Sequence, residues 1–383
     1  FYKLVDKQTL FTETGVQPAT YNTILQLYAD IKEKPELIEV ADHVLFMPDL
    51  INYLLSGVLV NEYTIASTSG LLNSQTQTWS SSLFARLGLP EKWFSKVSKG
   101  GTVLRNLSPR IAQNLKIEPF DVIAGAGHDT AAAVLAVPYV DEQPTVFISC
   151  GTWSLVGMES QTVLTSLEAL NAGLTNEGCF DGGIRLLKNT TGLWIIQELQ
   201  RDWQLQGEEI GFAEMVVLAR EVKDNRSFIN PNATIFASPG DMEEKVKDYC
   251  RMSGQIVPET KGEVVRTVLE SLALAYHQTV EQLEELTGKE IARIQMVGGG
   301  IQNELLCQLT ANFARKPVIT GPIEASALGN VLSQLLTLGI VQSREEAQNL
   351  IRQSELLKSY VVEDLDNVET SQQFFKSLVE KGE

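Results

Sequence analysis

The chain has few of the residues that carry disulfide, zinc or simple histidine chemistry. Its 383 residues include four cysteines and three histidines. The cysteines stand far apart, at positions 150, 179, 250 and 307, with no Cys-x-x-Cys pair. This spacing argues against a disulfide framework and against a typical zinc site, and favours reduced, buried thiols. The histidines, at positions 43, 128 and 277, are too dispersed to predict a metal site, so we predict no metal-ligating residues.

Long apolar runs, a signal peptide and an excess of positive charge are also lacking. Acidic residues outnumber basic ones by 48 to 31, which gives a formal net charge of −17. Such a field repels phosphate and argues against nucleic-acid or anionic-membrane partners. Apolar residues make up 44% of the chain, enough for more than one buried core. We therefore expect a cytoplasmic globular protein, whose oligomeric state the sequence does not give.

Strands alternate with helices along the chain, which predicts an α/β fold with two lobes and a cleft between them. Each predicted strand is a short apolar run that leads into a turn. The predicted strands cover residues 122–124, 146–149, 294–297 and 318–320, and the predicted helices cover 131–135, 265–286, 305–313 and a segment from Ala325. Pro138 and the polar stretch 141–144 mark a boundary, which divides the chain into domains 1–139 and 140–383.

Residues 18–56 are predicted to be mainly helical. Within them, residues 47–56 carry apolar side chains at helical spacing, with Pro48 suited to the first turn and Gly57 suited to the end. We expect this helix to pack its apolar face against the core. The stretch 212–232 is expected to mix helix and loop.

Asp129 is the first candidate for catalysis. It follows a strand and a glycine turn and stands just before a helix, where side chains project into the cleft of an α/β fold. A carboxylate there can accept a proton from a substrate hydroxyl as its oxygen attacks a phosphorus atom. The alternative is that Asp129 only caps the helix. A hydrolase pair of His128 with Ser154 is a further alternative, but no nucleophile-elbow pattern supports it.

Two glycine turns are candidates for binding an anion or a flat ligand. Residues 150–154 (Cys-Gly-Thr-Trp-Ser) offer backbone amides and the Thr152 hydroxyl after a strand. Residues 298–300 (Gly-Gly-Gly) join a strand to a helix, with Asn303 three residues on. This run is neither a dinucleotide fingerprint nor a P-loop. Each turn is open to the alternative that it only connects two elements.

Taken together, these motifs resemble the FGGY family of carbohydrate kinases in order and spacing from end to end. The resemblance implies that Asp129 is the catalytic base and that His128 and Thr130 contact the sugar. It also implies that Thr152 contacts the nucleotide phosphates and that Gly299 lies against the nucleotide. The implied fold is the two-lobed, ribonuclease H-like fold of actin-like ATPases, and the implied cofactors are ATP and Mg²⁺.

Within the family, the segments 175–178, 185–189, 192–194 and 321–325 are most similar to those of rhamnulokinases. By that resemblance Asn189 contacts the sugar and Gln197 the nucleotide. The implied reaction is phosphorylation of L-rhamnulose to L-rhamnulose 1-phosphate in L-rhamnose catabolism. Kinases for L-fuculose, L-ribulose or D-xylulose are alternatives from the same family, and a non-catalytic sugar or nucleotide sensor is an alternative from another class.

The sequence departs from the family pattern at several points. Cys150, Cys179, Asn312 and Gly70 stand where Ser, Gly, Asp and Gln are usual, and none of these changes removes a proposed contact. Family members open with an Asp-x-Gly phosphate loop and a Trp-Gly-Val-Asp sugar segment, and neither occurs here. The first residue is Phe1 rather than Met. From these departures we expect a fragmentary N-terminus, an incomplete first lobe and a chain that is inactive or nearly so as written.

Overall fold

The computed structural model describes residues 1–222, 227–363 and 367–381. These residues form two compact units, neither of which is continuous in sequence. The first unit consists of residues 1–136, 158–187 and 325–351, and the second of residues 137–157, 188–324 and 352–383. Among the described residues no helix is both long and apolar enough to cross a bilayer.

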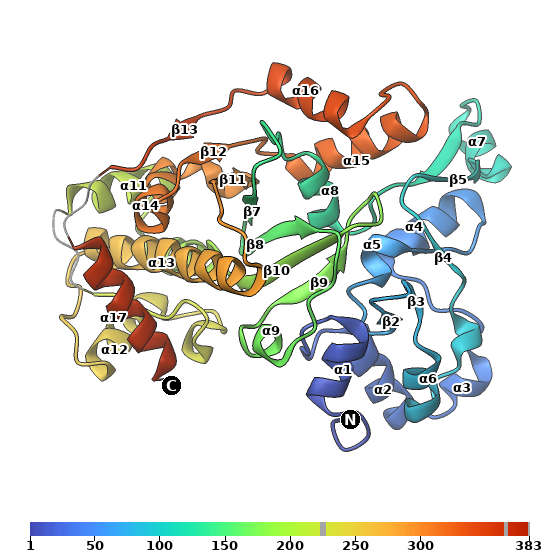
Figure 1. Cartoon of the computed structure of the whole chain (residues 1–383), viewed down its shortest axis with the longest axis horizontal. Helices are drawn as coiled ribbons and strands as arrows, with labels where there is room; N and C mark the ends of the chain where they lie inside the picture. Colours follow the sequence, from blue (N-terminus) through green and yellow to red (C-terminus); the bar gives the residue numbers. More distant parts are fainter. Residues whose placement is uncertain (223–226, 364–366, 382–383) are drawn as a thin grey trace. The chain divides into compact units, whose positions relative to one another are not determined.

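The first unit is mainly helical, with several short strands (Figure 1). Its helices are α1 (Lys7–Thr14), α2 (Thr23–Glu33), α3 (Leu37–Val40), α4 (Met47–Ser56), α5 (Tyr63–Ala66), α6 (Ser81–Leu87), η1 (Glu91–Trp93), α7 (Pro109–Leu115), α8 (Asp129–Leu135), α9 (Leu167–Asn171), α15 (Ala325–Thr337) and most of α16 (Arg344–Ser354). Its strands are β1 (Asn61–Glu62), β2 (Leu72–Asn73), β3 (Thr78–Trp79), β4 (Val97–Ser98), β5 (Thr102–Asn106), β6 (Asp121–Ala124) and β9 (Thr175–Gly178).

The second unit combines a sheet with long helices. It contains β7 (Thr145–Cys150), β11 (Arg293–Val297), β12 (Val318–Thr320), β13 (Ser359–Tyr360), α10 (Trp194–Leu205), α11 (Phe212–Glu221), η2 (Thr234–Phe236), α12 (Met242–Met252), α13 (Lys261–Thr287), η3 (Gly299–Gln302), α14 (Glu304–Ala314) and α17 (Val368–Glu380). Strands β8 (Trp153–Ser160) and β10 (Ile184–Thr191) have residues in both units. The strand order of the sheet is β13-β12-β11-β7-β8-β10-β9.

The centre of this sheet follows the predicted strand–helix alternation. Strand β11 pairs in parallel with β7 on one side and with β12 on the other, while β8 pairs antiparallel to β7. Parallel strands need crossover connections, and α14 supplies the one between β11 and β12. The long helix α13 lies beside α14 in Figure 1. It begins at a capping box of Thr260 and Glu263 and ends at Gly288 with φ of 67°.

The predicted division at 139/140 makes each lobe one continuous stretch of sequence, whereas each compact unit is made of three separate segments. The chain first passes from one unit to the other at 136/137, and residues 158–187 and 325–351 then belong with the N-terminal residues. The reason is tertiary packing: α15 lies beside α8 (Figure 1), and an added Cβ at Gly329 would collide with the backbone of Ala132. The assignment of 1–139 and 140–383 to two kinase lobes stays a proposal.

Helix α4 has the predicted bounds, but the expectation that it packs its apolar face against the core is wrong. Met47, Ile51 and Leu54 are 69%, 50% and 57% exposed, whereas the buried residues of the helix are Asp49 and Ser56. The buried carboxylate of Asp49 accepts hydrogen bonds from the backbone N–H of Glu62, at 3.2 and 3.3 Å. This polar contact orients the helix with its apolar side chains outward.

Candidate active site

Asp129 opens helix α8, directly after the turn that follows β6. Its Oδ1 atom accepts a hydrogen bond from the backbone N–H of Thr130 at 2.7 Å. Within the described ranges no donor lies within hydrogen-bonding distance of Oδ2, and the side chain is 82% exposed. The cap residue of the helix is His128, whose Nδ1 accepts from the same N–H at 3.2 Å. The carboxylate of Asp129 therefore shares in capping through one oxygen and presents the other to solvent.

Two side chains from β1 and α5 hold the turn that leads to Asp129. Glu62 Oε2 accepts a hydrogen bond from the backbone N–H of Gly127 at 3.0 Å, and Thr64 Oγ1 accepts one from the N–H of His128 at 3.0 Å. The Thr64 hydroxyl donates in turn to Glu62 Oε2 at 2.5 Å. A Cβ on residue 127 would lie 2.8 Å from that Glu62 oxygen, so the turn requires glycine. Neither Glu62 nor Thr64 was predicted to have a role in the site.

Two buried carboxylates lie behind this turn. Asp49 is 0% and Glu62 1% exposed. Burial raises the pKa of Asp49 to about 7, with the nearby Glu62 charge contributing, and burial also raises the pKa of Glu62. Glu62 bonds directly to the turn and Asp49 bonds to the backbone of Glu62. Because the pKa of Asp49 is about 7, its protonation changes near neutral pH.

The predicted sugar contacts of the first unit are His128 and Thr130. The His128 side chain is 19% exposed, and its pKa is lowered by burial first and by the neighbouring Arg185 charge second. Thr130 is buried, and its hydroxyl lies 3.4 Å from Asp129 Oδ1. His128 and Asp129 thus present polar atoms near the surface, whereas the Thr130 hydroxyl faces the carboxylate of Asp129.

In the second unit, the two glycine turns and α10 border one cavity of about 520 Å³. It is lined by Gly151, Thr152, Leu193, Ile196, Gln197, Phe212, Ala213, Met215, Val216, Val265, Gly299, Gly300, Gln302 and Asn303. The three residues predicted to contact a nucleotide are therefore brought together, although they lie up to 147 positions apart. The Thr152 hydroxyl donates to Gln197 Oε1 at 3.0 Å.

A buried polar cluster supports the turn between β7 and β8. The hydroxyls of Ser154 and Tyr276 are 2.6 Å apart, and Cys150 Sγ lies 3.8 Å from the Tyr276 hydroxyl. All three residues are almost fully buried, and burial raises the pKa of the Cys150 thiol. An added Cβ at Gly300 would collide with Cys150 Sγ. The close approach of η3 to β7 therefore depends on glycine.

Comparison with known proteins identifies the family. The N-terminal domain of the FGGY family of carbohydrate kinases matches residues 2–136, and its C-terminal domain matches residues 146–338. The chain belongs to the FGGY family of carbohydrate kinases. The FGGY chain is similar to the rhamnulokinase of Bacteroides thetaiotaomicron, with 38% identity over 379 residues, which cover 99% of this chain and 77% of that protein. It is also 38% identical to the rhamnulokinase of Halalkalibacterium halodurans over 358 residues, covering 94% of this chain and 75% of that protein.

Solved structures of FGGY kinases share the fold. A xylulose kinase from Rhodospirillum rubrum superposes with a TM-score of 0.76 and 18% identity, over 98% of this chain and 75% of that one. A Plasmodium falciparum glycerol kinase determined with ADP superposes with a TM-score of 0.77 and 15% identity, over 98% and 74%. The predicted α/β, actin-like ATPase fold is confirmed, and family membership supports a sugar kinase.

The cavity of the second unit fits the nucleotide that kinases of this FGGY family use. Its volume is within the range of about 300–1,000 Å³ usual for ligand pockets. A Cβ added at Gly299 would meet nothing within 4 Å, so the glycine leaves open space beside the backbone. The lining includes no carboxylate, and the described residues contain no cluster of three or more His, Cys, Asp or Glu able to hold a metal. The lining therefore provides no carboxylate ligand for Mg²⁺.

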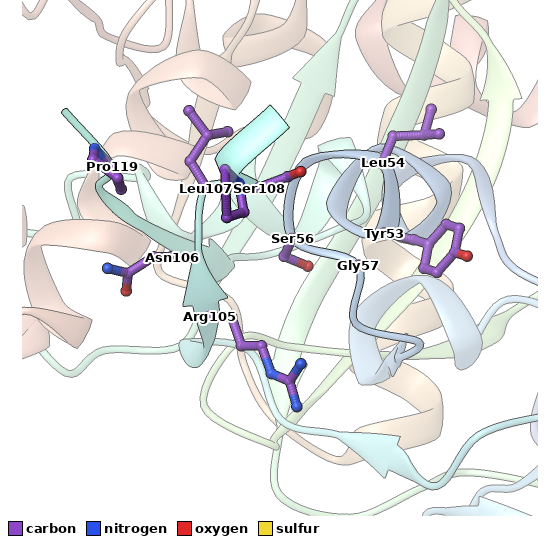
Figure 2. Close-up of a pocket in the computed structure, with 10 residues that line it drawn as sticks. Tyr53, Leu54, Ser56, Gly57, Arg105, Asn106, Leu107, Ser108 and Pro119 are labelled. Carbon is purple, nitrogen blue, oxygen red and sulfur yellow. The ribbon is translucent and has the colours of Figure 1, made fainter. Parts of the chain in front are cut away.

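Two further features of this FGGY chain are the predicted contact Asn189 and a second cavity. Asn189, the predicted sugar contact of the second unit, is half-buried in β10. A cavity of about 680 Å³ in the first unit contains none of the predicted residues. Figure 2 shows that the end of α4 and strand β5 border it, with Arg105 contributing its one charged side chain. The sequence analysis gave no signal for this cavity.

Proposed function

We propose that this protein phosphorylates a ketose with ATP. The specific reaction proposed is the conversion of L-rhamnulose to L-rhamnulose 1-phosphate in L-rhamnose catabolism. Family membership supports the sugar kinase, and the rhamnulokinases at 38% identity support the choice of sugar. The observation that carries the mechanism is the carboxylate of Asp129, which is held through one oxygen and exposed at the other.

Asp129 is the general base in this proposal. Its Oδ2 atom takes the proton of the sugar's primary hydroxyl as that oxygen forms a bond to the γ-phosphorus and the bond from phosphorus to the ADP oxygen breaks. The fixed turn of Gly127 and His128 keeps the carboxylate in place. His128, Thr130 and Asn189 are the proposed sugar contacts.

Thr152, Gln197 and Gly299 are the proposed nucleotide contacts. Bound ATP supplies the phosphoryl group. On binding, the Thr152 hydroxyl turns from Gln197 Oε1 to donate its proton to a phosphate oxygen, and free amides of its turn donate to others. These hydrogen bonds lower the energy of the charge on the group in transfer. Gly299 lets the nucleotide lie against the backbone. Kinases of this family use ATP, generally with Mg²⁺.

The test is ADP release by the protein expressed from its full reading frame, measured with a panel of ketoses. We expect kcat/KM to be highest for L-rhamnulose, because a pocket built to hydrogen-bond one pattern of hydroxyls discriminates strongly against others. A preference for L-fuculose, L-ribulose or D-xylulose would show that the proposed substrate is wrong, while the proposed kinase activity would stand. Sugar or nucleotide binding without any turnover would contradict the catalytic proposal in favour of a sensor. The inactivity of the 383-residue chain alone stays a prediction, which the same assay on that chain tests.

A further inference from the structure

The ring of His128 meets two N–H donors at the same nitrogen. Its Nδ1 atom lies 3.2 Å from the backbone nitrogen of Thr130 and 3.2 Å from Nη2 of Arg185. Neither a backbone amide nitrogen nor a guanidinium can accept a hydrogen bond. Both contacts therefore require Nδ1 to carry a lone pair rather than a proton.

Arg185 is held firmly enough to impose this requirement. Its side chain is fully buried, and Nη2 lies 2.7 Å from Glu177 Oε2. Nη1 donates to the backbone carbonyl of Gly178, and the antiparallel register of β10 and β9 pairs Arg185 directly with Glu177. Moving the guanidinium away would leave a buried carboxylate unpaired, which is strongly unfavourable.

The Thr130 amide is a weaker constraint. It is shared with Asp129 Oδ1, which accepts from it at the shorter distance of 2.7 Å. The guanidinium of Arg185 is therefore the donor that decides the protonation of His128 Nδ1.

We propose that Arg185 is a positioning residue that fixes His128 as the neutral tautomer with its proton on Nε2. The ring then has a single donor, Nε2–H, which suits it to a hydroxyl oxygen of a polyol or sugar. That the ligand is the ketose of the kinase reaction rests on the proposed function, whereas the tautomer does not.

The charged groups around the ring oppose one another. Asp129 on α8, with Oδ1 3.4 Å from Nδ1, and Glu177 on β9 favour the charged imidazolium. Burial and Arg185 on β10 favour the neutral ring, and these two influences prevail, because the pKa of His128 is lowered. A proton on Nδ1 would also point at the N–H groups of Arg185 and Thr130.

Nitrogen NMR of the imidazole rings in the 383-residue chain tests the tautomer without requiring catalysis. The chain has only three histidines, at positions 43, 128 and 277, so each signal can be assigned by a single substitution. We expect His128 to show an unprotonated Nδ1 and a protonated Nε2 at pH 7–8. A protonated Nδ1 at pH 7, as either the other tautomer or the imidazolium, would overturn the proposal.

A pair of variants separates positioning from simple support of the fold. Arg185→Met combined with Glu177→Leu replaces the buried ion pair by apolar side chains, an exchange that folded proteins often tolerate. The matched control is Arg344→Lys, because Arg344 forms ion pairs with two carboxylates, Glu159 and Asp181, in the same unit. Circular dichroism checks that both variants are folded.

We expect the double variant to show a mixture of both neutral tautomers, and the control to keep the native signal. A double variant with the native tautomer unchanged would overturn the role of Arg185. In the protein from the full reading frame, the double variant is expected to raise KM for the ketose about tenfold with a smaller change in kcat. Absence of turnover with every ketose would overturn the proposed function while leaving the NMR result to decide the tautomer.

Discussion

Two neighbouring glycines of η3 should respond in opposite ways to the same substitution. Gly300 is buried, and an added Cβ would collide with Cys150 Sγ and lie 2.9 Å from Cys150 Cβ and 3.0 Å from its carbonyl oxygen. Gly299 is exposed and lines the cavity of the second unit, and its added Cβ would meet no protein atom within 4 Å. Packing therefore requires glycine at position 300, whereas at position 299 only the proposed nucleotide contact does.

The expected magnitudes follow from these contacts. Gly300→Ala forces the methyl group into a filled space, which typically costs about 1–3 kcal/mol of unfolding free energy. Gly299→Ala is sterically free, and restricting the unfolded chain should stabilise the protein by about 0.4–1 kcal/mol. The same methyl group takes space from the cavity, so we expect ATP and ADP to bind roughly tenfold more weakly, a loss of about 1.4 kcal/mol.

Thermal unfolding and isothermal titration calorimetry with ATP and ADP measure the two effects on the 383-residue chain. Cys150→Ala added to Gly300→Ala removes the sulfur from the collision and should restore part of the lost stability. Native stability in Gly300→Ala would show that the packing argument is wrong. Unchanged nucleotide affinity in Gly299→Ala would show that the nucleotide does not lie against this glycine.

Three further predictions concern the turns and the carboxylates behind them. In the protein from the full reading frame, Asp129→Asn should lower kcat about 10²–10⁴-fold and leave the affinity for ATP, measured by calorimetry, unchanged. A loss of ATP affinity as large as the loss of kcat would refute the role of Asp129 as base. Because burial raises the pKa of Asp49 to about 7 and that of Glu62 as well, the folded state binds protons at these two groups that the unfolded state releases, so their contribution to the unfolding free energy should fall as pH rises from 4 to 8. In urea titrations the native chain should therefore lose unfolding free energy relative to Asp49→Asn as pH rises, and an unchanged difference would contradict this. Tyr276→Phe removes a hydrogen-bond partner of the buried Ser154 hydroxyl and should lower the unfolding free energy by about 1–3 kcal/mol. Adding Ser154→Ala should recover much of this loss. Additive losses in chemical denaturation would show that the two hydroxyls do not interact.

Local patterns were sufficient to predict the elements around the candidate site. Strand β6, helix α8, strand β7 and the long α13 all lie where apolar periodicity, glycine and capping residues indicated. The pattern of α4 gave its bounds correctly and its orientation wrongly. Periodicity shows that a helix has an apolar face but not which face turns inward, and here the buried contact of Asp49 with the Glu62 amide decides it. A buried carboxylate cannot be expected from sequence, because its cost is offset only by partners that the fold brings near.

The groups that hold the proposed base come from parts of the chain far from Asp129. Glu62 and Thr64 stand more than 60 positions before it, and Arg185 stands 56 positions after it. Arg185 belongs to a segment, 185–189, that resembles rhamnulokinases, but a resemblance does not say which residues are in contact. The role of Arg185 depends on the β9–β10 register that pairs it with Glu177, and a slip of one residue would turn its side chain to the other face of the sheet. The position of Asp129 at the start of α8 could be predicted because strand, turn and acid are adjacent in sequence. The hydrogen bonds that orient it could not be, because they exist only once distant strands have paired.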